Sequence, residues 1–225
     1  MLYILNIETA TKNCSVALAK NGETIICKEI SELGYSHAEK LHVFIEEICN
    51  ESSIQLKDLQ AIAVSKGPGS YTGLRIGVSA AKGFCYALDI PLISVDTLAV
   101  LASQAVSNAK ENDLIVPMID ARRMEVYSAI FNNKLEKVRE IEAQIIDENS
   151  FTSIEETVYF VGDSSEKAKA VLTNSNFIFL DEIVYPSAKD MSTISFQKFL
   201  NKDFEDVAYF EPFYLKDFLI TTSKK

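Results

Sequence analysis

The first thirty residues alternate between apolar and polar side chains in the manner of paired β-strands. Segments 3–7, 14–20 and 24–30 each read as a strand, and the dipeptide Asn21-Gly22 between the second and third is a strong hairpin turn. We therefore predict that the chain begins with three strands, of which the last two are antiparallel neighbours.

The pattern then changes to the spacing of a helix. Ser36-His37-Ala38-Glu39 is a capping box, and the helix behind it has one apolar face, formed by Leu41, Phe44, Ile45 and Ile48. A fourth strand at 61–65, a helix ending near Leu88 and a fifth strand at 91–95 follow. The predicted order is β-β-β-α-β-α-β.

The second half of the chain restarts this pattern. Segments 5–18 and 117–130 each contain an apolar strand, an acidic residue (Glu8 or Asp120), a polar turn and an alternating strand. Beyond them, strands are predicted at 138–146 and 158–163, and helices near 153–156, 164–172 and 187–200.

This repetition predicts two tandem α/β domains, residues 1–100 and residues 101–225, with a cleft between them. No segment rich in Pro, Gly or Ser separates the halves, so we expect them to pack together rather than flex freely. The last residues of the second domain are free to pack back on the first.

The segment SKGPGSYTGLRIG, residues 65–77, combines four glycines with a proline. It lacks the lysine and hydroxyl that end a Walker A loop, and its G-x-G-x-x-x-G spacing is one residue longer than a Rossmann fingerprint. A tight strand-to-helix turn fits better, with a positive φ at Gly69 and a helix cap at Ser70 or Thr72. The amides at the helix start leave anion binding open as an alternative.

The helix after this loop has two apolar stripes, whereas packing on a sheet needs only one. The second stripe consists mostly of small residues: Gly73, Ile76, Gly77, Ala80, Gly83, Phe84 and Ala87. A helix buried within its own domain would explain two stripes, and so would a face on which another chain docks.

The charge of the chain limits its partners. With 225 residues, 48% of them apolar, the chain can form an ordinary core, but its net charge of −10 makes it a poor stand-alone binder of nucleic acid. The start, MLYILNIETA, lacks the basic region of a signal peptide, and no apolar run reaches the roughly 20 residues of a membrane helix. We expect a cytoplasmic protein whose four cysteines are buried and reduced.

Several motifs together resemble the TsaB (YeaZ) family of bacterial proteins that act in the threonylcarbamoyl modification of tRNA adenosine. They are LNIETATKNCSVALA, SHAEKL, GPGSYTGLRIG, IDARRMEVY and PFYLK, and they span nearly the whole chain. The resemblance implies the ASKHA fold of acetate and sugar kinases, Hsp70 and actin, built as a duplicated β-β-β-α-β-α-β unit. That fold agrees with the repeat described above.

The resemblance also implies a role without catalytic residues. The chain would be a scaffold that pairs with the catalytic paralogue TsaD and helps to recruit the ATPase TsaE, so that threonylcarbamoyl is transferred to N6 of the adenosine 3′ to the anticodon. ATP and a metal ion would act in those partners, and tRNA would be bound only through the complex. The expected partner interface lies on two helices and consists of Glu39, Lys40, Val43, Gly73, Ile76, Gly77, Ala80 and Phe84.

The sequence departs from the family pattern at three sites. The first turn is Glu8-Thr9-Ala10-Thr11 in place of D-T-S-T, Met124 stands where glycine is frequent, and Lys216 stands where arginine is usual. Because the first turn has no glycine with which to hold phosphate, Glu8, Thr9 and Asp120 are interpreted as structural residues or the remnant of a nucleotide site. The two histidines, His37 and His42, are five residues apart on a helix and suit no shared metal.

Two other functions compete with the scaffold. An independent ASKHA-type ATPase or small-molecule kinase would share the fold, but it needs phosphate-binding hairpins that the sequence lacks. A protease would need a nucleophile with a base, or a set of metal ligands, and neither is evident. The sequence leaves open whether the free chain is a homodimer.

Overall fold

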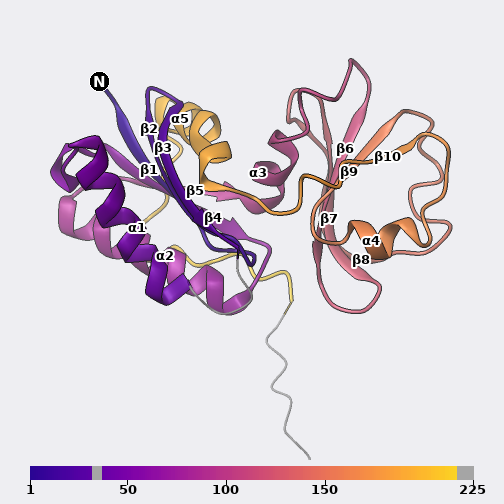
Figure 1. The fold of residues 1–225 in the computed structure, drawn as a ribbon, viewed down its shortest axis with the longest axis horizontal. Coiled ribbons are helices and arrows are strands. Elements are labelled where there is room, and N and C mark those ends of the chain that lie inside the picture. The colour runs from indigo at the N-terminus through magenta and orange to yellow at the C-terminus, as the bar shows by residue number, and fades with distance from the viewer. Residues whose placement is uncertain (32–36, 217–225) are drawn as a thin grey trace, which may run out of the picture.

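Two α/β lobes lie side by side in the computed structural model, which describes residues 1–31 and 37–216 (Figure 1). The first sheet contains β1 (Tyr3–Glu8), β2 (Cys14–Lys20), β3 (Glu23–Ile30), β4 (Ala61–Gly67) and β5 (Leu92–Asp96). The second contains β6 (Leu114–Asp120), β7 (Glu125–Asn132), β8 (Lys137–Ile145), β9 (Val158–Val161) and β10 (Phe177–Phe179). The remaining elements are α1 (His37–Ser52), η1 (Leu56–Asp58), α2 (Tyr71–Leu88), α3 (Thr97–Ser103), α4 (Ser165–Lys169), η2 (Ala188–Met191) and α5 (Ser192–Leu200).

The two sheets share one strand order. The first runs β3-β2-β1-β4-β5, and the second runs β8-β7-β6-β9-β10 in the corresponding direction. In the first sheet, β1 is antiparallel to β2 and parallel to β4, and β4 is parallel to β5. In the second sheet, β6 is antiparallel to β7 and parallel to β9, and β9 is parallel to β10. This equivalence confirms the duplicated α/β fold that the repeat in the sequence predicted.

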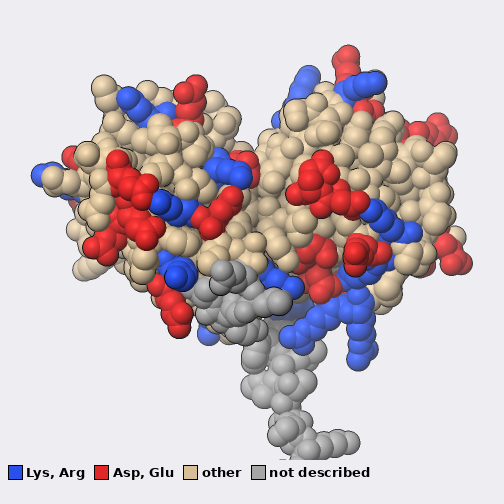
Figure 2. Space-filling model, viewed as in Figure 1, with Lys and Arg blue, Asp and Glu red and all other residues tan. Residues whose placement is uncertain are grey.

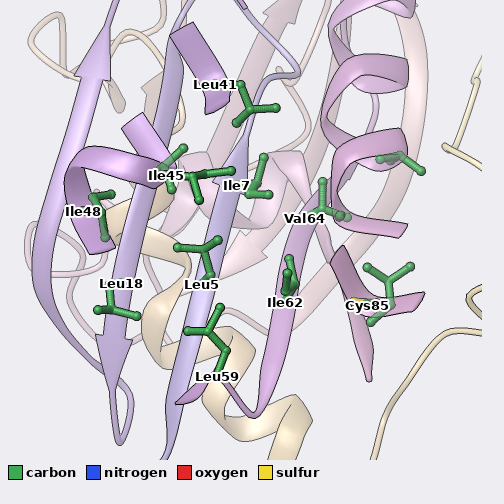
Figure 3. Close-up of a cluster of buried hydrophobic side chains, with 14 of the residues drawn as sticks. Leu5, Ile7, Leu18, Leu41, Ile45, Ile48, Leu59, Ile62, Val64 and Cys85 are labelled. Atoms are coloured by element: carbon green, nitrogen blue, oxygen red, sulfur yellow. The ribbon is translucent and has the colours of Figure 1, made fainter. Parts of the chain in front are cut away.

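The core of the first lobe forms where α1 and α2 cover one face of the first sheet (Figures 1 and 3). Alternate residues of the strands point into it, because successive side chains of a strand face opposite sides. The labelled side chains of this core come from the sheet and from both helices: Leu5, Ile7, Leu18, Leu41, Ile45, Ile48, Leu59, Ile62, Val64 and Cys85. The predicted apolar face of α1 is therefore the face that packs on the sheet.

The opposite face of the first sheet is covered by the last helices of the chain. Ile4, Ala63 and Ile93 on that face pack against Ala188 and Met191 of η2, and α5 packs beside them. Conversely, α3 follows the fifth strand of the first sheet, yet its Leu98 and Leu101 pack on the second sheet. Each half thus contributes its final helix to the core of the other half, and the predicted boundary near residue 100 falls within α3.

Most predicted elements are confirmed within a few residues, including the Asn21-Gly22 turn, where both residues have positive φ angles of 53° and 89°. The predicted helix at 153–156 is wrong. The carbonyl oxygens of Ile154 and Glu156 accept hydrogen bonds from the Asn176 side chain, at 3.0 and 2.7 Å, so the segment forms turns. The helix α3, capped by Asp96, was not predicted.

Candidate functional site

The glycine loop is a packing junction between α2 and the turn that joins β1 to β2. A Cβ atom placed on Gly69 would lie 2.3 Å from the carbonyl oxygen of Ala10, and one on Gly73 would lie 2.1 Å from that of Thr9. The backbone amide of Ser70 donates to Ala10 O at 2.6 Å, and Thr9 Oγ1 donates to Gly73 O at 2.8 Å. Glycine is needed here because two backbones touch.

The start of α2 is closed by groups of the same chain. Ser70 caps the helix as predicted, since its Oγ accepts from Gly73 N at 3.3 Å and its carbonyl accepts from Leu74 N. The predicted positive φ at Gly69 is wrong: the left-handed residue is Gly67, with φ +116°. Gly67 takes that conformation where the chain passes beneath the carbonyl of Phe213, 2.5 Å from where a Cβ would stand.

Glu8 lies in the interior of the first lobe and has no exposed surface. Its Oε1 accepts from Ala10 N at 2.6 Å, whereas its Oε2 has no hydrogen-bond partner within the described residues. Ser65 approaches the carboxyl group without reaching hydrogen-bond geometry. Burial raises the pKa of Glu8 to about 7, against an opposing effect of the hydrogen bond from Ala10. Thr9, the next residue, is likewise fully buried.

Asp120 occupies the equivalent position in the second lobe, but there the carboxylate is exposed. It forms an ion pair with Lys167 and accepts from Arg122 N at 3.1 Å. Its own amide donates to Asp163 Oδ1 at 2.8 Å. Burial raises the pKa of Asp163, while Asp120 N lowers it. Within the described residues, no hydrogen bond or ion pair joins the Glu8 and Asp120 side chains.

The predicted partner interface divides into two parts. Gly73 and Gly77 are buried against Thr9, whose Oγ1 would lie 2.2 Å from a Cβ on Gly77, so these two glycines are corrected to internal contacts. The other six residues reach the surface of α1 and α2 to different degrees: Glu39, Lys40, Val43, Ile76, Ala80 and Phe84. Val43 is 43% exposed, and the His42 and Phe84 rings connect the helices, with 5.9 Å between their centroids. We call these six residues the helical face.

The last described residues of the chain pack back on the first lobe, at the glycine loop. Phe213 N donates to Lys66 O at 2.7 Å, and Arg75 on α2 donates to the Tyr214 hydroxyl at 3.2 Å. Lys216 then forms an ion pair with Glu125 of the second lobe. These partners are separated by roughly ninety to 150 positions, so local patterns along the chain carry no signal for them. The PFYLK motif is thereby placed at the junction of both lobes.

The histidines do not share a site. His37 is buried, and its Nε2 lies 2.8 Å from Thr11 O, while His42 is exposed. Among residues 1–31 and 37–216, no cluster of three or more His, Cys, Asp or Glu side chains could hold a metal ion. In the same part of the chain, no helix has the length and apolar character to cross a bilayer.

Comparisons with known proteins relate the chain to proteins of the threonylcarbamoyl modification of tRNA adenosine. The sequence model described as "TsaD: tRNA N6-adenosine threonylcarbamoyltransferase" matches residues 31–221. The tRNA threonylcarbamoyladenosine biosynthesis protein TsaB of Escherichia coli is 32% identical over 224 residues, which cover 96% of this chain and 95% of that protein. The protein of the same name from Haemophilus influenzae is 29% identical over 226 residues, covering 96% and 94%.

A solved structure with the same fold is that of YeaZ from Pseudomonas aeruginosa. The two superpose with a TM-score of 0.82 over 96% of this chain and all of that one, at 24% sequence identity. At that identity, the likeness supports the fold alone.

Proposed function

Because the chain belongs to the TsaB family of tRNA threonylcarbamoyladenosine biosynthesis proteins, we propose that it acts in that modification as a non-catalytic scaffold. It pairs with TsaD, and the transfer of threonylcarbamoyl to N6 of the tRNA adenosine takes place on TsaD. TsaE joins this assembly and supplies ATP hydrolysis. tRNA is bound by the assembly and not by this chain alone, in keeping with the net charge of −10.

The observation that carries this proposal is the closure of the ancestral site in the first lobe. Glu8 and Thr9, which correspond to the phosphate turn of an ASKHA kinase, have no exposed surface. The turn itself is held against α2 through Thr9 and Ala10. A buried carboxyl group at Glu8 and a first turn without glycine favour a scaffold over an independent kinase or ATPase.

The proposed docking surface is the helical face. Ala80 and Ile76 lie one turn apart on α2, and Val43 on α1 exposes an apolar side chain between charged neighbours, Glu39 and Lys40. A pair of helices from TsaD packed here would complete a four-helix arrangement, in which small residues allow close approach of the backbones.

Reconstitution tests the proposed function. The purified chain, TsaD and TsaE from the same organism are combined with ATP, threonylcarbamoyl-adenylate and tRNA, and modified adenosine is measured by mass spectrometry. We expect modification to require this chain, and we expect the chain alone to turn over no ATP. Steady ATP turnover by the chain alone would instead support the independent kinase or ATPase.

Ala80→Arg is expected to lower the affinity for TsaD by about a hundredfold. The substitution puts a long charged side chain where two helices must approach, and burying an unpaired charge costs several kcal/mol. Folding should be retained, because Ala80 is only partly buried in the free chain. Isothermal titration calorimetry with TsaD measures the affinity, and circular dichroism melting measures the fold.

Ser79→Arg is the matched control, since it adds the same side chain to the exposed polar side of the same helix. Val43→Arg provides a second probe of the helical face, on α1, should Ala80→Arg lower the melting temperature. Normal TsaD binding by a folded Ala80→Arg variant, together with normal binding by Val43→Arg, would place the interface elsewhere.

A further inference from the structure

The turn between β6 and β7 presents two arginines side by side. Arg122 and Arg123 have φ angles of +74° and +53°, a conformation that residues other than glycine seldom adopt, and never without support from the surroundings. Both side chains are exposed. Neither forms an ion pair or hydrogen bond through its guanidinium group with any residue of 1–31 or 37–216.

The backbone of this turn is held firmly from its inner side. Lys167 Nζ on α4 donates to the carbonyl oxygens of Arg123 and Glu125, at 2.9 and 2.7 Å, and pairs with Asp120. The amides of Ala121 and Glu125 close the turn with hydrogen bonds of 3.1 Å each. Lys167 and the two backbone hydrogen bonds thus hold the backbone of the turn that carries the two arginines.

Nearby carboxylates do not neutralise these arginines, because each already has another partner. Asp120 is paired with Lys167, Glu125 is paired with Lys216, and Asp163 accepts from the Asp120 amide. The chain has a net charge of −10, yet Arg122 and Arg123 stand next to each other without an ion pair to any described residue. They are available to an anion outside the chain.

A third cation comes from the other lobe. Lys12, in the turn between β1 and β2, is exposed, and it lies close enough to Asp163 to oppose the effect of burial, which raises the pKa of that carboxyl group. Because Asp163 also accepts a hydrogen bond from Asp120 N, Lys12 and the turn that follows Asp120 both lie near this carboxyl group. Figure 2 shows Lys and Arg side chains projecting below the junction of the lobes. We call Lys12, Arg122 and Arg123 the cationic turn cluster.

We propose that the cationic turn cluster contacts the phosphodiester backbone of tRNA within the assembly with TsaD. This inference rests on the proposed function, which brings tRNA to that assembly. Arginine forks match phosphate geometry, and the backbone that carries them is already held in place before binding. Because the net charge of the chain is −10, RNA is expected to approach it where basic side chains are grouped, and contacts to phosphate position RNA without reading its sequence.

The test uses the reconstituted assembly of this chain with TsaD. Arg122→Gln/Arg123→Gln keeps a Cβ atom at both positions and removes two charges, while Lys110→Gln/Lys134→Gln removes two exposed charges at the opposite end of the same sheet. Fluorescence anisotropy with labelled tRNA gives the Kd at several salt concentrations. We expect the arginine variant to bind about tenfold more weakly near physiological salt, with a salt slope smaller by about two, and the lysine variant to bind like wild type.

Arg122→Lys/Arg123→Lys separates charge from structure, and it should recover most of the lost affinity. Size-exclusion chromatography reports assembly with TsaD in the same samples. If wild type does not assemble, the proposed function fails. If the arginine variant assembles and binds tRNA with the wild-type affinity and salt slope, the proposal for the cluster is overturned while the scaffold stands. An arginine variant that no longer assembles with TsaD would also overturn it, because the arginines would then contact a carboxylate of the protein partner.

Discussion

Gly73→Ala is expected to lower the free energy of unfolding by about 4 kcal/mol, near the upper end of what one substitution does. The added Cβ would stand 2.1 Å from the carbonyl oxygen of Thr9, so a backbone must move. Movement of that turn would also break the hydrogen bonds from Thr9 Oγ1 to Gly73 O and from Ser70 N to Ala10 O. Urea denaturation followed by circular dichroism measures the loss.

The same helix supplies the control. Gly83→Ala places a Cβ in open space, with no atom within 4 Å, and should raise the free energy of unfolding by up to about 1 kcal/mol, the difference in helix propensity. Both substitutions add one methyl group to α2, so their opposite signs isolate the contact with Thr9. Equal effects would mean that the turn yields easily and that close packing is not the reason for glycine at position 73.

Glu8→Gln should be more stable than wild type at pH 8. Between about pH 4 and pH 8, its free energy of unfolding should rise by roughly 3 kcal/mol relative to that of wild type. The folded chain raises the pKa of Glu8 from 4.5 to about 7 through burial, so the folded state holds the proton more tightly than the unfolded state. The contribution of protonated Glu8 to the free energy of unfolding is complete below pH 4.5, and it is lost as the pH rises through 7, because the folded chain must then release the proton. Glutamine is always neutral, and its Oε1 can still accept from Ala10 N.

Unfolding free energies of both proteins between about pH 4 and pH 8 test this prediction. Burial also raises the pKa of Asp190 to about 6, but Asp190 is present in both proteins and its contribution cancels in the difference. Glu23→Gln, at an exposed position on β3, controls for the loss of one negative charge. Parallel pH profiles for wild type and Glu8→Gln would contradict the prediction, because they would show that folding does not raise the pKa of Glu8.

The elements of the first half could be predicted because their patterns arise from the face that each buries. The strands alternate and α1 repeats every three to four residues, since both pack on one core. The helix expected at 153–156 failed for a non-local reason: Asn176, twenty positions away or more, takes the carbonyl oxygens that a helix would use. Nothing in the local sequence shows such a partner.

The candidate sites show the same limit. The small residues of α2 predicted a close contact, but the pattern could not distinguish an internal partner from another chain, and Gly73 and Gly77 turned out to face Thr9. The unpaired state of Arg122 and Arg123 depends on which lysines reach Asp120 and Glu125. Those lysines, Lys167 and Lys216, lie 47 and 91 positions from their partners, so a count of charges along the sequence shows only an acidic protein.

The exchange of final helices between the lobes has a consequence for biosynthesis. A ribosome delivers the chain from its N-terminus, and domains commonly fold in that order as they emerge. Here the first sheet is complete once β5 has emerged, but the apolar face with Ile4, Ala63 and Ile93 lacks most of its cover until η2 and α5 leave the exit tunnel. This face of the sheet is therefore largely exposed to solvent while more than a third of the chain is synthesised. During that period it offers a chaperone an apolar surface to bind.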